Sequence, residues 1–400
     1  MMNLFEKQLG EIISTKKLSL QGQIKIFDVY RIPLEFLRYN KKNGRIATYV
    51  SQYIDEGNEF PKDNLVEFND IIENYIERSN PDALKKTKRN IQIMSQTEPA
   101  VVLSNGIVLD GNRRFTSLRQ LSREGAGAEF NYLEAVILDE RLYTEKDIKR
   151  LELNLQHAVE SRVDYNPIDR LVDIYRDLIS DKSNFTVEEY SRETHLSIKK
   201  VKDEVELAQL MLDYLEYINQ PLKFYIARDQ KIDGPLREVQ KIIKSSKLDP
   251  DRIDDAKEYL FLNIMSLDGD ITRKIRELKQ VLEDREHSEK LFEDIEEDEI
   301  LDDANDYFES DSVKEKISEK HSVEMATDLS RRIAKLTEEA VESKKLSTAK
   351  IQPIEILEKS YRILQEVDKE AVERMGTTSK QQFLSVLRNM SETLEKLNCL

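Results

Sequence analysis

The chain has 400 residues, of which 39% are hydrophobic and 35% are charged, and its net charge is −16. This length predicts two or three domains, and the small numbers of glycines and prolines favour a mostly helical protein. A single cysteine, Cys399, excludes an internal disulfide, and no apolar run approaches the roughly 18 residues needed to cross a membrane. We therefore expect a cytoplasmic protein that does not associate with a membrane.

The negative charge is concentrated in the second half of the chain. Residues 1–50 carry nine Lys and Arg against four Asp and Glu, and residues 1–200 carry 30 against 32. Segment 289–311, in contrast, is acidic between a few apolar residues. We interpret this segment as the solvated face of a helix or a linker. The alternative is a surface that mimics nucleic acid or binds a basic protein partner.

The first hundred residues contain one strand signal and a long helical stretch. Residues 22–32 alternate apolar and polar side chains, which predicts a strand. The segment that follows turns toward a helix expected to begin near Gly44, and helical spacing then continues from Ile46 to about Gln96.

A hairpin followed by a helix is predicted next. Asn105 and Gly106 separate the apolar runs AVVL (100–103) and IVLD (107–110), and Asn-Gly between such runs is a strong hairpin signal. After Asp110 the apolar period changes from two to 3.6 residues. Residues 128–138 indicate another strand, and almost only helix signals follow Thr144. The expected fold is therefore an α+β N-terminal domain followed by a predominantly α-helical middle and C-terminal region.

The junction between this hairpin and its helix has the features of an anion site. Gly111 permits a close approach of the backbone to a ligand, and the unbonded amides of the first helical turn point outward. Arg113 and Arg114 add charge-assisted hydrogen bonds to phosphate oxygens. Asp110 can cap the helix, bind a sugar hydroxyl or hold a metal. The alternative is a capped helix that carries surface arginines.

Three segments resemble the signature boxes of the ParB/sulfiredoxin-like superfamily, in the same order. The sequence PAVVLSNGIVLDGNRRFTSL (99–118) is similar to the second box, a hairpin followed by Gly-x-Arg-Arg and a helix. Residues 151–179 resemble the third box and the Asn-Pro-Ile segment after it. Residues 32–46 are a looser match to the first box, whose arginine corresponds to Arg45.

The resemblance implies a nucleoside triphosphate, CTP or ATP, bound with Mg²⁺. In ParB proteins the Gly-x-Arg-Arg segment cradles the triphosphate of CTP, which here corresponds to Gly111, Asn112, Arg113 and Arg114, and an asparagine of the third box faces the magnesium ion, here Asn154.

Two positions of the third box depart from the family. The box's glutamate is replaced by Leu153, which cannot ligate Mg²⁺, and its closing arginine by His157. Glu152 is adjacent to Leu153 but is expected to point about 100° away on a helix. The resemblance therefore implies nucleotide binding without efficient hydrolysis.

Residues 185–211 resemble the helix-turn-helix that follows this domain in ParB proteins. We expect Thr186 to cap a short helix over residues 188–194, and residues 196–197 to form the turn into a second helix. His195 replaces the usual turn glycine, which is tolerable because histidine adopts positive φ more often than most residues.

The second of these helices carries three lysines that we expect to contact DNA phosphates: Lys199, Lys200 and Lys202. The alternative is that these segments are packed helices of an all-α middle domain.

The expected domains are 1–160 for nucleotide binding, 161–220 for the helix-turn-helix-like segment and 221–400 for an acidic helical C-terminal domain. The last of these contains amphipathic helices, which either pack in a core of their own or pair subunits. The stripe expected to form a homo-oligomer seam at the end of the chain consists of Leu384, Leu387, Leu394 and Leu397.

These features predict a ParB-like, DNA-associated protein in which a triphosphate bound at the DGNRR motif controls the arrangement of helical domains or subunits. The alternative is an enzyme that uses the same pocket as an NTPase, a nuclease or a small-molecule kinase, in a mobile-element or phage-defence setting. The small-molecule kinase stays an alternative because two glutamates, Glu35 and Glu98, lie close in sequence to the boxes. Sulfiredoxin chemistry is excluded because Asn112 occupies the position of the catalytic cysteine.

Overall fold

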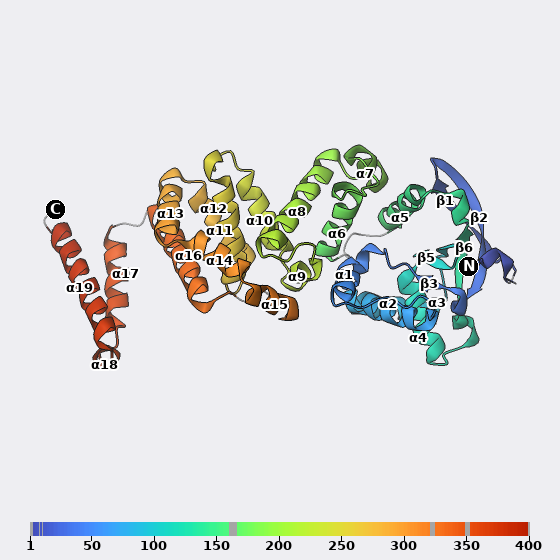
Figure 1. Cartoon of the computed structure of the whole chain (residues 1–400), viewed down its shortest axis with the longest axis horizontal. Helices are drawn as coiled ribbons and strands as arrows, with labels where there is room; N and C mark the ends of the chain where they lie inside the picture. The colour runs from blue at the N-terminus through green and yellow to red at the C-terminus, as the bar shows by residue number, and fades with distance from the viewer. Residues whose placement is uncertain are drawn as a thin grey trace. The chain divides into compact units, whose positions relative to one another are not determined.

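A computed structural model describes residues 3–7, 9, 11–159, 166–320, 325–348 and 353–398. The chain forms two compact units, Met1–Ala340 and Val341–Leu400 (Figure 1). The expected domain boundaries at residues 160 and 220 both fall inside the first unit. Cys399 lies outside the described residues.

The first unit begins with an α+β region, as expected. Its described strands form one sheet in the order β1-β2-β6-β4-β5-β3, in which β6 pairs parallel with β4, β5 pairs parallel with β3, and the other neighbours are antiparallel. The strands are β1 (Ser14–Leu20), β2 (Gln23–Pro33), β3 (Arg38–Tyr39), β4 (Ala100–Leu103), β5 (Ile107–Asp110) and β6 (Tyr132–Leu138).

The strands expected at 22–32 and at the 100–110 hairpin are confirmed. The strand expected at 128–138 is shorter, because residues 128–131 form a 3₁₀ turn. The sequence analysis did not predict strand β1. The alternation of apolar and polar residues in this strand is confined to Leu18 and Leu20, which are the two side chains that it buries.

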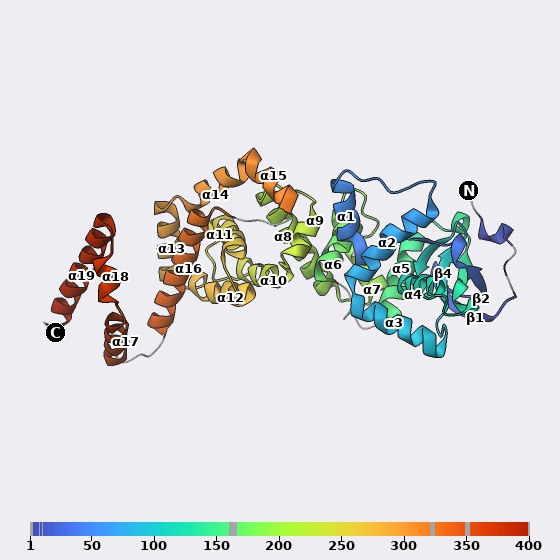
Figure 2. The same ribbon diagram turned by 90° about the horizontal axis from the view of Figure 1, so that it is seen from below.

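Helices cover both faces of the sheet (Figures 1 and 2). The α2, α3 and α4 helices pack on the face that carries Ala100 and Val102, whereas α5 packs through Leu151 on the face that carries Val101 and Leu103. A 3₁₀ turn from Gly44 to Ile46 leads into α1, which confirms a helix beginning near Gly44. The helices are α1 (Ala47–Asp55), α2 (Leu65–Ser79), α3 (Pro81–Met94), α4 (Asn112–Arg123) and α5 (Glu145–Val159).

The remainder of the first unit is helical within the described residues. The helices are α6 (Pro167–Ile174), continued by a π-helical turn (Tyr175–Ile179), α7 (Val187–Thr194), α8 (Ile198–Tyr217), α9 (Phe224–Asp229), α10 (Asp233–Ile243), α11 (Ile253–Ser266), α12 (Ile271–Leu282), α13 (Arg285–Glu297), α14 (Ile300–Glu309), α15 (Asp311–Lys320) and α16 (Thr327–Thr348), whose residues from Val341 onward belong to the second unit. None of the described helices is long and apolar enough to cross a lipid bilayer.

The α7 and α8 helices lie where the sequence resemblance places the two helices of a helix-turn-helix, which itself stays a prediction. Thr186 caps α7 in a reciprocal capping box with Glu189, and His195 ends the helix at φ 56°. His195 thus adopts a positive φ, which the sequence analysis considered tolerable for histidine at this position. Ser197 then caps α8 by accepting a hydrogen bond from the Lys200 amide.

The acidic segment 289–311 falls on α13 and α14. These two helices bury Leu291, Phe292, Ile300 and Phe308 and leave most of their carboxylates in water. The interpretation as a solvated helix face is therefore confirmed, and binding of a basic protein partner stays a prediction.

The second unit contains α17 (Pro353–Gln365), α18 (Lys369–Glu373) and α19 (Thr377–Asn398). Along the described part of α19 no side chain is buried, and the four leucines of the predicted stripe are 38–54% exposed.

Candidate anion-binding site at the start of α4

The DGNRR motif forms the sharp connection between β5 and α4. Strand β5 ends at Asp110, Gly111 adopts φ +97°, and α4 begins at Asn112. A Cβ atom at Gly111 would lie 2.8 Å from the Cβ of Ala100 and 3.1 Å from a guanidinium nitrogen of Arg114. Glycine is therefore required here both by the backbone conformation and by the lack of space.

No side chain among the described residues caps the first turn of α4. The amides of that turn therefore keep their capacity to bind an anion, and the helix dipole adds positive potential. Phe115 and Leu118 are fully buried and fix the helix on the sheet. The Nε of Arg119, also on α4, donates a hydrogen bond to the carboxylate of Glu73 on α2 at 2.7 Å.

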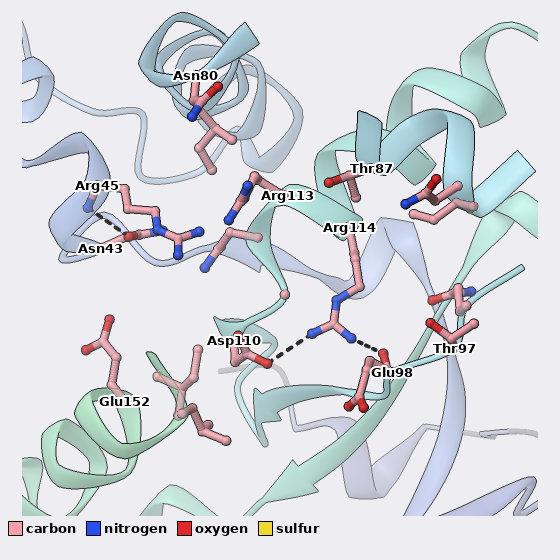
Figure 3. A pocket seen from close by; sticks show the side chains of 18 of the residues that line it. Asn43, Arg45, Asn80, Thr87, Thr97, Glu98, Asp110, Arg113, Arg114 and Glu152 are labelled. Atoms are coloured by element: carbon pink, nitrogen blue, oxygen red, sulfur yellow. Dashed lines mark hydrogen bonds and ion pairs between the residues drawn. The ribbon is translucent and has the colours of Figure 1, made fainter. Parts of the chain in front are cut away.

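The two arginines of the motif have different surroundings (Figure 3). Arg114 donates to the carboxylate of Asp110 at 3.0 Å and to the backbone carbonyl of Glu98. It therefore ties the turn to the loop that precedes β4. Arg113 instead extends toward the open space near Arg45. Phosphate binding by Arg113 and by Arg114 stays a prediction.

A cavity of about 340 Å³ opens beside this turn. It brings together the sequence-predicted residues Arg45, Asp110, Gly111, Asn112, Arg113 and Arg114. Its polar lining also includes Glu98, which the sequence analysis names close to the boxes, Glu152, which it placed away from the site, and four residues that it did not name: Asn43, Asn80, Thr87 and Asn90. Asn43 also orders the turn that carries Arg45, because its side-chain oxygen accepts a hydrogen bond from the Arg45 amide at 3.1 Å.

Two buried oxygens at this cavity lack a hydrogen-bond partner among the described residues. They are the amide oxygen of Asn112, whose residue is 8% exposed, and Oε1 of Glu152, whose residue is 5% exposed. Leaving a buried polar group unpaired costs about 1–3 kcal/mol. Because both residues line the cavity, a bound molecule could supply the missing partners.

Glu152 faces the cavity, so the expectation that it points away from the site is wrong. Ile148 and Leu151 pack against the sheet, and Glu152 shares their side of α5 because it lies four residues after Ile148. Burial raises the pKa of the Glu152 carboxyl, and Asp173 raises it further, while the Lys149 ammonium 3.6 Å away opposes the increase.

Asn154 and Leu153 take no part in the cavity lining. The Asn154 amide donates to Glu193 of α7 at 3.0 Å, and Leu153 is buried. A magnesium role for Asn154 stays a prediction. Nothing is described of the His157 side chain. Among the described residues, no group of three or more His, Cys, Asp and Glu side chains is arranged to hold a metal.

The predicted DNA-contacting lysines lie on the first turn and a half of α8. Lys199 and Lys202 are exposed. Lys200 is also exposed, but it forms an ion pair at 2.8 Å with the buried Glu204, which Arg170 and Arg237 also approach. Lys199 and Lys202 are therefore the more available of the three for a phosphate.

No family model matches this chain, and no curated protein matches its sequence. Among solved structures it is similar to a Pnob8-like ParB-N domain determined in a C2221 crystal form, with 13% identity and a TM-score of 0.28. That match covers 67% of this chain and 99% of the ParB-N chain.

Proposed function

We propose that this chain binds a nucleoside triphosphate, CTP or ATP, at the cavity beside Gly111 and acts as a nucleotide-dependent, DNA-associated protein in the cytoplasm. The observation that carries this proposal is the convergence of Arg45, Arg113 and the uncapped start of α4 on one cavity. Two guanidinium groups and a helix N-terminus at one place favour a polyanion over a singly charged ligand.

The remaining walls suit the uncharged part of a nucleotide. Asn80, Thr87 and Asn90 offer hydrogen-bonding groups, and Ile91 and Met94 offer apolar surface. Ligand sites commonly combine apolar surface with a few polar groups in this way, and their volumes start at about 300 Å³.

The acidic residues of the cavity fit a magnesium ion that arrives with the triphosphate. Mg²⁺ in nucleotide sites is usually held by one or two carboxylates together with phosphate oxygens. Glu152 and Asp110 offer carboxylates at the cavity, and Asn154 is the residue that the sequence resemblance assigns. The ion would neutralise phosphate charge beside these carboxylates.

The cavity is mechanically connected to the helical region, which supports control of domain arrangement. The α1 helix begins two residues after Arg45, and its Thr48 amide donates to Asp169 of α6 at 3.0 Å. Arg228 of α9 donates to the Thr48 hydroxyl at 3.1 Å and lies 4.0 Å over the Tyr49 ring. A ligand that moves Arg45 would therefore displace the helix to which α6 and α9 are attached.

Nucleotide binding is tested by thermal unfolding of the full chain with CTP, ATP, GTP or UTP and Mg²⁺. At 100 times its dissociation constant, one nucleotide should stabilise the wild type by about 2.7 kcal/mol. Arg113→Ala should lose most of this response because a cavity cation is removed, whereas Arg192→Ala, an exposed arginine of α7, should retain it. An equal response in both variants would count against the site.

Glu152 favours the enzyme alternative, an NTPase, nuclease or kinase that uses the same cavity. A buried carboxyl with a raised pKa beside bound phosphates has the properties of a general base. Release of inorganic phosphate by the wild type but not by Glu152→Gln would support this alternative.

We also propose that α17 and α19 associate with a second copy of the chain. Large apolar side chains of these helices are exposed, among them Tyr361 at 63%, Ile363 at 57% and Leu394 at 51%. Exposed apolar patches of this kind usually mark an interaction surface.

The oligomer is tested by light scattering after size exclusion. The wild type should show twice the chain mass of 46.8 kDa. The double variant Leu384→Asp/Leu387→Asp should be monomeric because it places charges in the apolar stripe, while Ser385→Asp/Asn389→Asp, on the opposite face of α19, should remain dimeric. A monomeric wild type would refute the dimer.

A further inference from the structure

A second cavity of about 510 Å³ lies in the α+β region, between strand β3 and the loop that joins α1 to α2. It shares no lining residue with the cavity beside Gly111. Its charged groups are Arg38, Lys41 and Lys62, with Glu59 as the one acidic residue of the lining. Phe60 and Phe68 form an aromatic wall.

The cations of this cavity are uncompensated, within the part of the chain that the structure describes. The Arg38 guanidinium lies 4.9 Å over the Phe68 ring, and its Nε is buried without a hydrogen-bond partner. Lys41 and Lys62 are exposed and form no described ion pair.

This arrangement is unusual for a chain with a net charge of −16. On the neighbouring α4 helix, Arg119 and Arg123 both pair with Glu73 and Asp70 of α2. The three cations of the second cavity, in contrast, create a local positive potential that attracts a polyanion.

We propose that this second cavity binds the phosphate backbone of a single nucleic-acid strand. Arg38 would hold one phosphate with two parallel hydrogen bonds, and the exposed Lys41 and Lys62, which line the same cavity, would contact the neighbouring phosphates of an extended strand. Phe60 supplies an apolar face beside these cations, and proteins that bind single strands combine a basic groove with aromatic side chains. The site is independent of the nucleotide cavity.

The experiment measures fluorescence anisotropy of a labelled twelve-nucleotide thymidine strand with the full chain at several salt concentrations. We expect the wild type to bind, and Lys41→Ala/Lys62→Ala to bind about ten-fold more weakly. The slope of log Kd against log salt should fall by about 1.4 in this variant, because each lost phosphate contact contributes roughly 0.7 for a single strand. Both lysines are exposed, so the double variant should fold normally.

Three controls identify the cause of any loss. Lys247→Ala removes an exposed lysine of the helical region and should leave the affinity unchanged, as should Arg113→Ala in the nucleotide cavity. Duplex DNA tested with Lys199→Ala/Lys202→Ala separates binding by α8 from binding at the second cavity. If no nucleotide stabilises the chain in the thermal unfolding experiment, the measurement of strand binding still tests the second cavity.

Three results would overturn the proposal. They are a wild type that does not bind the strand, a Lys41→Ala/Lys62→Ala variant with unchanged affinity and salt slope, and pyrophosphate that displaces the strand as well as unlabelled strand does, mole for mole. The last result would assign the cavity to a small phosphate compound.

Discussion

Gly111→Ala is expected to lower the free energy of unfolding by about 2–4 kcal/mol. Placing an L-residue in the left-handed region at φ +97° costs about 1–2 kcal/mol, and the new Cβ would lie only 2.8 Å from Ala100, which adds an overpacking cost of about 1–2 kcal/mol. Urea denaturation of the full chain followed by circular dichroism measures the loss.

Gly125→Ala is the matched control for Gly111→Ala. Gly125 also has a positive φ, +67°, but a Cβ there meets nothing within 4 Å. The free energy of unfolding of Gly125→Ala should therefore fall only by the backbone cost of about 1–2 kcal/mol. Equal losses in the two variants would show that the contact with Ala100 relaxes freely. The Gly111 variant should also lose its thermal response to nucleotide, because the turn that presents Arg113 is displaced.

Asp169→Asn is expected to remove a pH dependence of stability worth about 3 kcal/mol between pH 5 and pH 8. Asp169 is fully buried at the contact between α6 and α1. Burial raises the pKa of its carboxyl to about 7, although hydrogen bonds from Thr48 and the charge of Arg228 act in the opposite direction.

The direction of this pH dependence follows from the number of protons that the folded and the unfolded chain bind. Between the unfolded pKa near 4 and the folded pKa near 7, the folded chain holds a proton on Asp169 that the unfolded chain has released. The stabilisation is therefore fully present below pH 4, falls by about 1.4 kcal/mol per pH unit as the pH rises, and is lost above pH 7. An uncharged asparagine keeps an oxygen for the Thr48 amide but does not titrate.

The measurement compares urea denaturation at pH 5 and pH 8. Asp177, whose pKa burial also raises to about 7, remains in both proteins, so only the difference between wild type and variant reports on Asp169. Asp181→Asn, an exposed aspartate of the loop before α7, should behave as the wild type. An unchanged pH dependence in Asp169→Asn would show that Asp169 is ionised at pH 5 in the folded chain.

The sequence by itself determined the features that depend on neighbouring residues. The Asn105–Gly106 turn, the N-cap at Thr186, the positive φ of His195 and the buried stripe of α4 are all encoded within a few residues of chain. Local signals suffice there because hydrogen bonds between near neighbours and the helical period decide these structures.

Only the tertiary structure decided which side chains meet at the candidate sites. Glu152 faces the cavity because Ile148 and Leu151 seat α5 on the sheet, and the Arg114 guanidinium is held by hydrogen bonds to Asp110 and to the carbonyl of Glu98. The cavity with Arg38 and Lys62 depends on segments separated in sequence and carries no local pattern. Such contacts arise from packing between distant elements, and the period of a single helix or strand does not contain that information.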